Sequence, residues 1–314
     1  MDRGKKNWCE VLTLLALALL ISCSKDNAVV QEPIPEGVAQ QAISFVVTHE
    51  GGPAATRATT VTDDASRTAA PGGSFTCFAY VANTTNVYIN GSTVSYAAST
   101  WSFDDGKHYW PATGNLDFFT YMPATKPTYI GDITYSVANG PSFVCSSLPV
   151  TSATQANVNE FIYAIATNQA KGNDVALAYK HPFATISVRL LTSHNAVYQL
   201  NSITFKSIKN NGTYTLGNVT QWVSSGEATN LVFSIEGAVS KAISEDADFT
   251  NDQLTAMQAP FLVMPQTLSG TDQIEVNLIW NDGDDAVTLT YDNPVATWEA
   301  GKSYTYTIDL AHPK

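Results

Sequence analysis

The sequence predicts an all-β protein that folds as two β-sandwich domains in tandem. Short segments rich in β-branched and aromatic residues recur along most of the chain, and Gly, Asn and Pro separate them. No stretch keeps a 3.6-residue period of apolar residues over three turns, and only Asn251–Met257 is a candidate for one short helix. The 314 residues, 44% of them hydrophobic, suffice for two cores of ordinary size.

The first 22 residues have the features of an export signal. Arg3, Lys5 and Lys6 make the start of the chain positive, and the apolar run Val11–Ile21 follows. A transmembrane helix needs about 20 consecutive apolar residues, so this run is too short to span a membrane. A positive start with a short apolar run is typical of a cleaved signal peptide.

The segment Leu20-Ile21-Ser22-Cys23 resembles the lipobox of bacterial lipoproteins. The resemblance implies cleavage between Ser22 and Cys23 and lipid on the Cys23 thiol. Two or more acyl chains anchor a protein stably, whereas one chain gives only marginal binding. The alternative is an ordinary signal peptide with an unrelated cysteine near its end. Residues 23–37 lack periodicity and hold two prolines, so we expect a flexible tether there.

Alternating segments predict strands along the rest of the chain. Ile43, Phe45 and Val47 alternate with their neighbours at its start, and Ala184–Leu190 alternates in the same way. The Asp-rich segment Asn281–Asp285 predicts the turn of a hairpin. Further strands are expected at Ser74–Val81, Leu116–Tyr121, Phe161–Ala166, Val175–Tyr179, Gln273–Trp280, Ala286–Tyr291 and Tyr304–Leu310.

The polar stretch Gln169–Asn173 is the best candidate for the link between two sandwiches. We therefore expect an N-terminal domain at residues 38–170 and a C-terminal domain at residues 171–314. Residues 51–73 form a long loop of small and polar residues in the first domain, whose only basic residues are Arg57 and Arg67. Long loops in compact domains are uncommon and are usually functional or disordered. Exposed tips of small residues are also where proteases cut.

The charge and the cysteines limit the classes of partner and compartment. The net charge of −12 argues against nucleic acid as a partner. Outside the leader and Cys23, the cysteines are Cys77 and Cys145. They could form a disulfide in an oxidising compartment, or they could be two buried free thiols in strands.

No constellation of residues predicts catalysis, a cofactor or a metal site. The sequence lacks the usual hydrolase, zinc-protease and phosphate-loop motifs, so we expect no enzyme. A hairpin turn explains Asp282–Asp285 better than a calcium loop, because the alternating acids of an EF-hand are missing. Aromatic residues around Asp104 and Asp105 could form a sugar platform, but core packing beside a polar turn is the preferred interpretation. The histidines, which lack metal-ligand spacing, are His49, His108, His181, His194 and His312.

An ordered set of motifs resembles the Mfa/FimA-like fimbrillins of Bacteroidota over nearly the whole chain after the leader. Beside the lipobox and the Ile43-x-Phe45 strand, the matching segments are Thr56–Thr59, Phe78–Tyr80, Tyr109–Pro111, Leu116–Tyr121, Phe161–Ala164, Tyr179–Ala184, Leu262–Thr267 and Trp298–Tyr304. The Lys25-Asp26 pair partly matches the export tag of surface lipoproteins in that phylum. The resemblance implies two transthyretin-like β-sandwiches, and a protein anchored by lipid in the outer membrane or built into a surface fimbrium.

The resemblance also implies a route of assembly. An arginine-specific surface protease would cut after Arg57 and before Ala58, with Arg67 as the second choice. The cut would release the strand that carries Ile43, Phe45 and Val47. A donor strand from another fimbrial subunit would then fill the groove, through backbone hydrogen bonds and alternate apolar side chains.

One departure from the family narrows the expected role. Stalk fimbrillins carry a donor extension after the last strand, whereas only residues 311–314 follow Leu310 here. We therefore expect a tip or accessory subunit that contributes to adhesion. The alternative is an unpolymerised surface lipoprotein that binds glycan or a host protein on the same scaffold.

Overall fold

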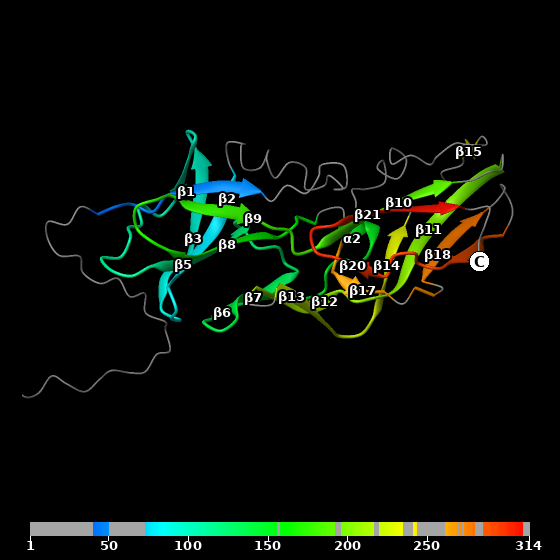
Figure 1. The fold of residues 1–314 in the computed structure, drawn as a ribbon. Helices are drawn as coiled ribbons and strands as arrows, with labels where there is room; N and C mark the ends of the chain where they lie inside the picture. The colour runs from blue at the N-terminus through cyan, green and yellow to red at the C-terminus, as the bar shows by residue number, and fades with distance from the viewer. Residues whose placement is uncertain are drawn as a thin grey trace, which may run out of the picture.

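The computed structural model describes residues 40–49, 73–155, 158–191, 196–216, 220–234, 241–243, 261–268, 270–271, 273–279 and 285–309. Across these residues the protein is built from β-strands, with one short helix, α2 (Ser152–Gln155). This confirms the expected all-β class. The strands gather into two regions at opposite ends of an elongated arrangement, and a further sheet lies between them (Figure 1).

The N-terminal region is a sandwich of unequal layers. One layer is an antiparallel sheet in the order β4-β3-β2-β5-β8, and the other contains the parallel pair β1 (Phe45–His49) and β9 (Val175–Tyr179). Every one of these strands contributes buried apolar side chains to the first core. The sheet strands are β2 (Ser74–Val81), β3 (Val87–Ala97), β4 (Thr100–Phe103), β5 (Leu116–Met122) and β8 (Ile162–Gln169).

The C-terminal region is also a sandwich. A sheet in the order β14-β11-β18-β19 faces a second in the order β16-β10-β21, and the second core contains side chains from both. The antiparallel pairing of β18 with β19 confirms the expected hairpin. The strands are β10 (Ala184–Leu191), β11 (Ala196–Ile208), β14 (Thr229–Ser234), β16 (Phe261–Val263), β18 (Ile274–Ile279), β19 (Val287–Tyr291) and β21 (Ser303–Asp309), with β15 (Lys241–Ile243) on β11 and β17 (Gln266–Thr267) paired with β20 (Thr297–Trp298).

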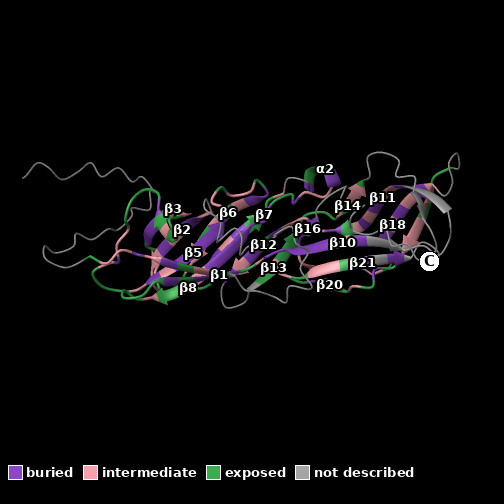
Figure 2. Cartoon of the chain, turned by 90° about the horizontal axis from the view of Figure 1, so that it is seen from above, coloured by how far each residue is buried: buried purple, intermediate pink, exposed green. Residues whose placement is uncertain are grey.

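A third core joins the two regions. It lies under a sheet in the order β13-β12-β7-β6, in which β7 comes from the first half of the sequence and β12 from the second. Aromatic side chains from the outer face of β5 and β8 pack on those of this sheet, so the buried surface runs through both regions (Figure 2). The strands are β6 (Ile130–Ser136), β7 (Gly140–Cys145), β12 (Asn211–Leu216) and β13 (Thr220–Ser225).

The packing does not follow the division that we expected between residues 170 and 171. Gln169–Asn173 connects β8 to β9, and β9 pairs with β1 and lies in the first core. The physical reason is that Val175, Leu177 and Tyr179 alternate inward and fill the layer opposite the five-stranded sheet. We propose that the first unit extends to Tyr179 and that the connection to the second follows it.

Candidate functional site

The candidate site is the groove in which residues 41–49 lie, where residues 41–43 pair with residues 108–110 and β1 pairs with β9. The Ile43 amide donates to the His108 carbonyl at 2.8 Å, and the Trp110 amide donates to the Gln41 carbonyl at 3.0 Å. Further along the chain, β1 runs parallel to β9 from Phe45 opposite Val175 to His49 opposite Tyr179. The extended segment 41–49 is therefore held by backbone hydrogen bonds in two successive parts, residues 41–43 by residues 108–110 and the residues from Ser44 onward by β9.

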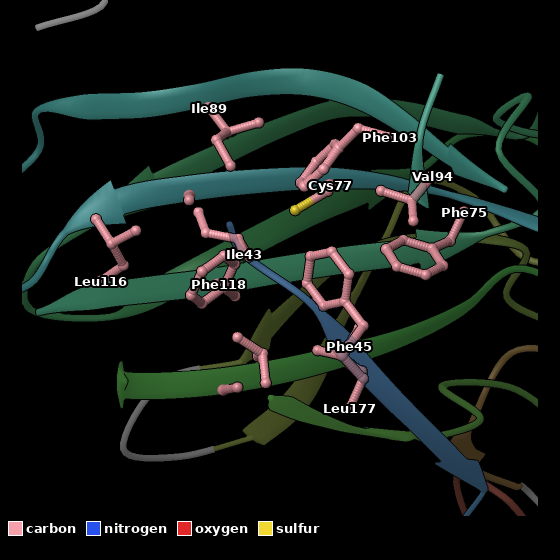
Figure 3. Packing of buried hydrophobic residues seen from close by; sticks show 14 of the residues in the cluster. Ile43, Phe45, Phe75, Cys77, Ile89, Val94, Phe103, Leu116, Phe118 and Leu177 are labelled. Carbon is pink, nitrogen blue, oxygen red and sulfur yellow. The ribbon is translucent and has the colours of Figure 1, made fainter. Parts of the chain in front are cut away.

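Side chains at alternate positions hold β1 in the core. Ile43 and Phe45 are 6% and 7% exposed, whereas Val46, which points the other way, is 48% exposed. The Phe45 ring makes edge contacts with three aromatic rings, at centroid distances of 5.3, 5.5 and 6.0 Å, and lies at the centre of the packing in Figure 3. These rings belong to Phe75, Phe103 and Phe118. Val47 is partly buried against the same cluster.

The floor of the groove is apolar and includes a thiol. Cys77 is fully buried near Ile43 and Phe45, and burial raises the pKa of its thiol. Cys145 lies in the third core, where burial raises the pKa of its thiol to about 12. Both cysteines are free, so of the two expected alternatives the structure shows buried thiols. At neutral pH they behave as small apolar side chains.

This arrangement suits strand replacement better than ligand binding. The groove offers backbone donors and acceptors first at residues 108–110 and then along β9, with apolar pockets at alternate positions. An extended segment with the same alternation satisfies both requirements, irrespective of its exact side chains. The sequence predicted the strand but not its backbone partners. Neither β9 nor residues 108–110 carry a signal of pairing with residues 41–49. The alternation in β9 predicted only that it was a strand.

Several residues named from the sequence lie outside the described part of the chain. The lipobox cysteine Cys23 with Ser22, and the cleavage residues Arg57, Ala58 and Arg67, are among them. The helix expected at Asn251–Met257, the residues Asp282–Asp284, and the histidines His194 and His312 are also outside it. Their assigned roles stay predictions from the sequence.

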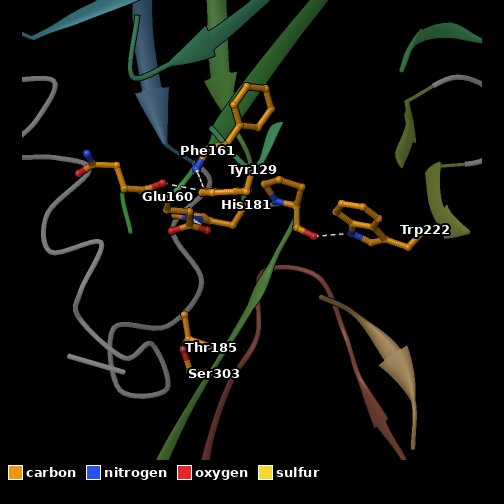
Figure 4. A network of polar contacts seen from close by, with 9 residues as sticks. Tyr129, Glu160, Phe161, His181, Thr185, Trp222 and Ser303 are labelled. Carbon is orange, nitrogen blue, oxygen red and sulfur yellow. Dashed lines mark hydrogen bonds and ion pairs between the residues drawn. The ribbon is translucent and has the colours of Figure 1, made fainter. Parts of the chain in front are cut away.

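His108 and His181 make local polar contacts. His108 Nε2 lies 2.9 Å from the carboxylate of Asp105 on an exposed turn. His181 Nδ1 lies 2.9 Å from the carboxylate of Glu160, with both side chains buried (Figure 4). The adjacent Pro182 carbonyl accepts a hydrogen bond from the Trp222 indole at 2.6 Å, which ties this segment to the third core. Within the described ranges, no group of three His, Cys, Asp or Glu residues could hold a metal ion.

The aromatic residues around Asp104 and Asp105 do not form a sugar platform. Phe103 and Trp110 are buried in the first core, and Trp101 packs against the same cluster. The two carboxylates accept hydrogen bonds from serine hydroxyls of β3 at 3.0 and 2.8 Å. The arrangement is core packing beside a polar turn, which is the interpretation that the sequence favoured.

Comparison with known proteins adds a family and a fold. A family model described as fimbrillin-like matches residues 56–313. No curated protein matches the chain. A solved structure of a candidate cell adhesion protein from Bacteroides ovatus ATCC 8483 is 13% identical and superposes with a TM-score of 0.55, covering 87% of this chain and 93% of that chain. This likeness shows a shared fold.

Two further solved structures are similar at lower scores. A fimbrial protein from Bacteroides vulgatus ATCC 8482 is 12% identical, with a TM-score of 0.47 over 88% of this chain and 97% of that chain. A candidate cell adhesion protein from Bacteroides uniformis ATCC 8492 is 16% identical, with a TM-score of 0.48 over 76% of this chain and 86% of that chain. In the described residues, no helix is long and apolar enough to cross a membrane.

Proposed function

We propose that this chain is a fimbrial subunit of the cell surface, that it is assembled by strand exchange, and that it contributes to adhesion. The chain belongs to the fimbrillin-like family, and this membership supports the proposal. In this proposal the chain is exported as a lipoprotein through Cys23. An arginine-specific protease then cuts after Arg57, and β1 leaves its groove for a strand of another subunit. The observation that carries the proposal is the burial of Ile43 and Phe45 in a segment that pairs first with residues 108–110 and then, as β1, with β9.

Proteolysis would act on β1 through its chain connection. A cut after Arg57 leaves β1 attached to the body of the protein by noncovalent contacts alone, because Arg57 lies between β1 and β2 in the sequence. The family model covers residues 56–313 and thus begins after β1, which agrees with a mature subunit that lacks this strand. The same cut separates the body of the protein from the lipid on Cys23.

The energetics favour exchange over an empty groove. Loss of β1 uncovers the apolar side chains that Ile43 and Phe45 cover, and burial of each such side chain is worth about 1.5–3 kcal/mol. Within the described residues, only β9 would then remain in the layer opposite the five-stranded sheet. A donor strand with the same alternation restores both the burial and the backbone hydrogen bonds. Assembly would therefore stabilise the cut subunit.

We further propose a tip or accessory position, which rests on the last strand. β21 pairs with β10 over seven residues, and its Tyr306 and Ile308 are buried in the second core. The Tyr306 hydroxyl also accepts a hydrogen bond from the Trp298 indole at 2.8 Å. Donation of β21 to another subunit would open this core. In this proposal the subunit accepts a strand at β1 and keeps its own last strand.

Limited digestion of the full chain with an arginine-specific protease tests this function. We expect a new N-terminus at Ala58, loss of β1 from the folded product, and oligomers when subunits with a donor strand are added. The Arg57→Ala variant should resist maturation, and the Arg67→Ala variant should mature normally. A folded product that keeps β1, or one that never takes up a strand, would count against the proposal.

A further inference from the structure

The sheet that covers the third core has an outer face with almost no charge. Its strands β6, β7, β12 and β13 contain a single charged residue, Asp132, although the chain carries a net charge of −12. Across three strands, Val144, Thr213 and Val223 are paired at one register and all are exposed. The exposed fractions of the two valines are 36% and 55%. These side chains form an uncharged row that runs across the sheet to its β13 edge.

The two edges of this sheet differ in how they are protected against pairing with another strand. At the β6 edge, the pairing with β7 is interrupted between Ile130 and Ile133, and Asp132 lies in the interruption. Bulges and charged residues are the usual means of preventing edge-to-edge pairing. At the β13 edge, the register with β12 is continuous from Thr220 to Ser225, and β13 contains neither a charge nor a proline. Among the described residues, β13 is therefore the unprotected edge of this sheet.

β13 is also held rigidly in place. The Trp222 side chain points into the third core, where its indole donates to the Pro182 carbonyl and its ring lies 4.9 Å from that of Tyr214. The side chains of Gln221, Val223 and the residues that follow are exposed. Alternate backbone groups of an edge strand point away from its sheet. In the part of the chain that the structure describes, no strand pairs with the other side of β13, which is thus an ordered template for another strand.

We propose that β13 pairs with β13 of a second copy of this chain, antiparallel about a two-fold axis at Val223. In this register, Val223 lies opposite Val223 of the second copy, and Gln221 lies opposite Ser225. Residues that lie opposite one another in an antiparallel pair share a face, so Trp222 of each copy keeps its place on the inner side. The row of Val144, Thr213 and Val223 then continues across both copies.

The distribution of charge permits a second copy as the occupant. Two chains of net charge −12 repel one another, so self-association requires a contact where neither copy brings acids together. Asp132 lies on the far edge of the sheet. Glu227 lies beyond the end of β13, and in an antiparallel pair the two copies of it lie at opposite ends. The β13 edge meets this requirement, and a two-fold axis makes it self-complementary.

The pairing would join subunits side by side and is independent of strand exchange at β1. One strand buries less than the roughly 1,200 Å² of a stable interface, so isolated copies should associate weakly. Copies repeated in a larger assembly would gain from multivalency. Covalent trapping is therefore the appropriate assay.

Disulfide trapping tests both the contact and its register. We would oxidise Val223→Cys in the full chain with Cys9→Ser and Cys23→Ser, since the remaining cysteines are buried. The two-fold pairing places the new thiols opposite one another, about 5 Å apart between β-carbons, and predicts a covalent dimer. The matched control is Ser225→Cys, for which the thiols would be about 14 Å apart from strand rise alone, so no dimer is expected.

Charge substitution supplies a second, noncovalent readout. Val223→Lys places two like charges opposite one another and should abolish the dimer in sedimentation at high protein concentration. Val144→Lys adds the same charge to the same face away from the edge and should leave the dimer intact. Three results would each overturn the proposal. The first is a strictly monomeric wild type together with no covalent dimer of Val223→Cys. The others are as much covalent dimer for Ser225→Cys as for Val223→Cys, and a noncovalent dimer that Val223→Lys does not abolish. Cleavage at Arg57 and strand uptake at β1 are measured separately, so neither result decides the other.

Discussion

Replacement of Phe45 by alanine should loosen β1 more than any neighbouring substitution on that strand. Phe45 is 7% exposed and contacts three aromatic rings, so the change removes a buried ring from the middle of the first core. Such substitutions cost about 3–5 kcal/mol, from lost burial and from the cavity left behind. Val46 on the same strand is 48% exposed, and its replacement by alanine should change stability by no more than about 0.5 kcal/mol.

Amide hydrogen exchange resolves this effect by segment. If β1 opens as a unit, 3–5 kcal/mol corresponds to exchange that is about a hundredfold to a few thousandfold faster in β1 and in its partner β9. The free energy of global unfolding sets the upper limit. Exchange in β18 and β21, which belong to the second core, should change least. Equal rates for Phe45→Ala and Val46→Ala in β9 would refute the assignment of Phe45 as the anchor of this strand.

Three further predictions concern the other cores. Tyr306→Phe leaves the buried Trp298 indole without its acceptor and should cost about 1–3 kcal/mol in denaturant unfolding, and an unchanged midpoint would contradict this. Burial raises the pKa of the Cys145 thiol to about 12. The contribution of this buried neutral thiol to the stability of the fold is therefore complete below pH 9 and declines as the pH rises toward 12. At pH 8 a thiol reagent should therefore find Cys77 and Cys145 only after unfolding. At Gly212 a β-carbon would lie 2.8 Å from a β13 carbonyl oxygen, so Gly212→Ala should cost about 1–3 kcal/mol by the same unfolding measurement, and no loss would contradict that crowding.

Strands with one buried face could be predicted well from the sequence. Val175–Tyr179 has its expected bounds, because Val175, Leu177 and Tyr179 face the core while the residues between them are less buried. The β18–β19 hairpin was also found, since both strands alternate beside a polar turn. Period-two alternation is a direct consequence of the pleat, so it can be read without knowing any partner.

Strands and contacts that depend on distant partners could not be predicted in the same way. A strand was expected at Leu116–Tyr121, but its burial on both faces, between the first and third cores, was not, because alternation is lost there. The pairing of Gly212 with Cys145 joins strands from opposite halves of the sequence, and neither strand carries a signal for the other. This pairing and the place of β9 explain why the expected boundary at residue 170 separated elements that pack together.

The candidate site was predicted in part for a related reason. Ile43, Phe45 and Val47 were identified from their alternation, and Ile43 and Phe45 are buried. The groove around them is made by backbone groups of residues 108–110 and of β9, which have no characteristic side chain. A site that binds through the backbone leaves little trace in the sequence.

Exchange of β1 is tested most directly by returning a strand to the emptied groove. The full chain is cut after Arg57, the released segment is removed, and a peptide of residues 41–49 is added while amide exchange is followed in β9. Strand exchange predicts that the peptide binds and slows exchange across Val175–Tyr179, and that the same peptide with Phe45→Asp does neither. Binding of both peptides alike, or a cut protein that takes up neither and stays folded, would contradict the account.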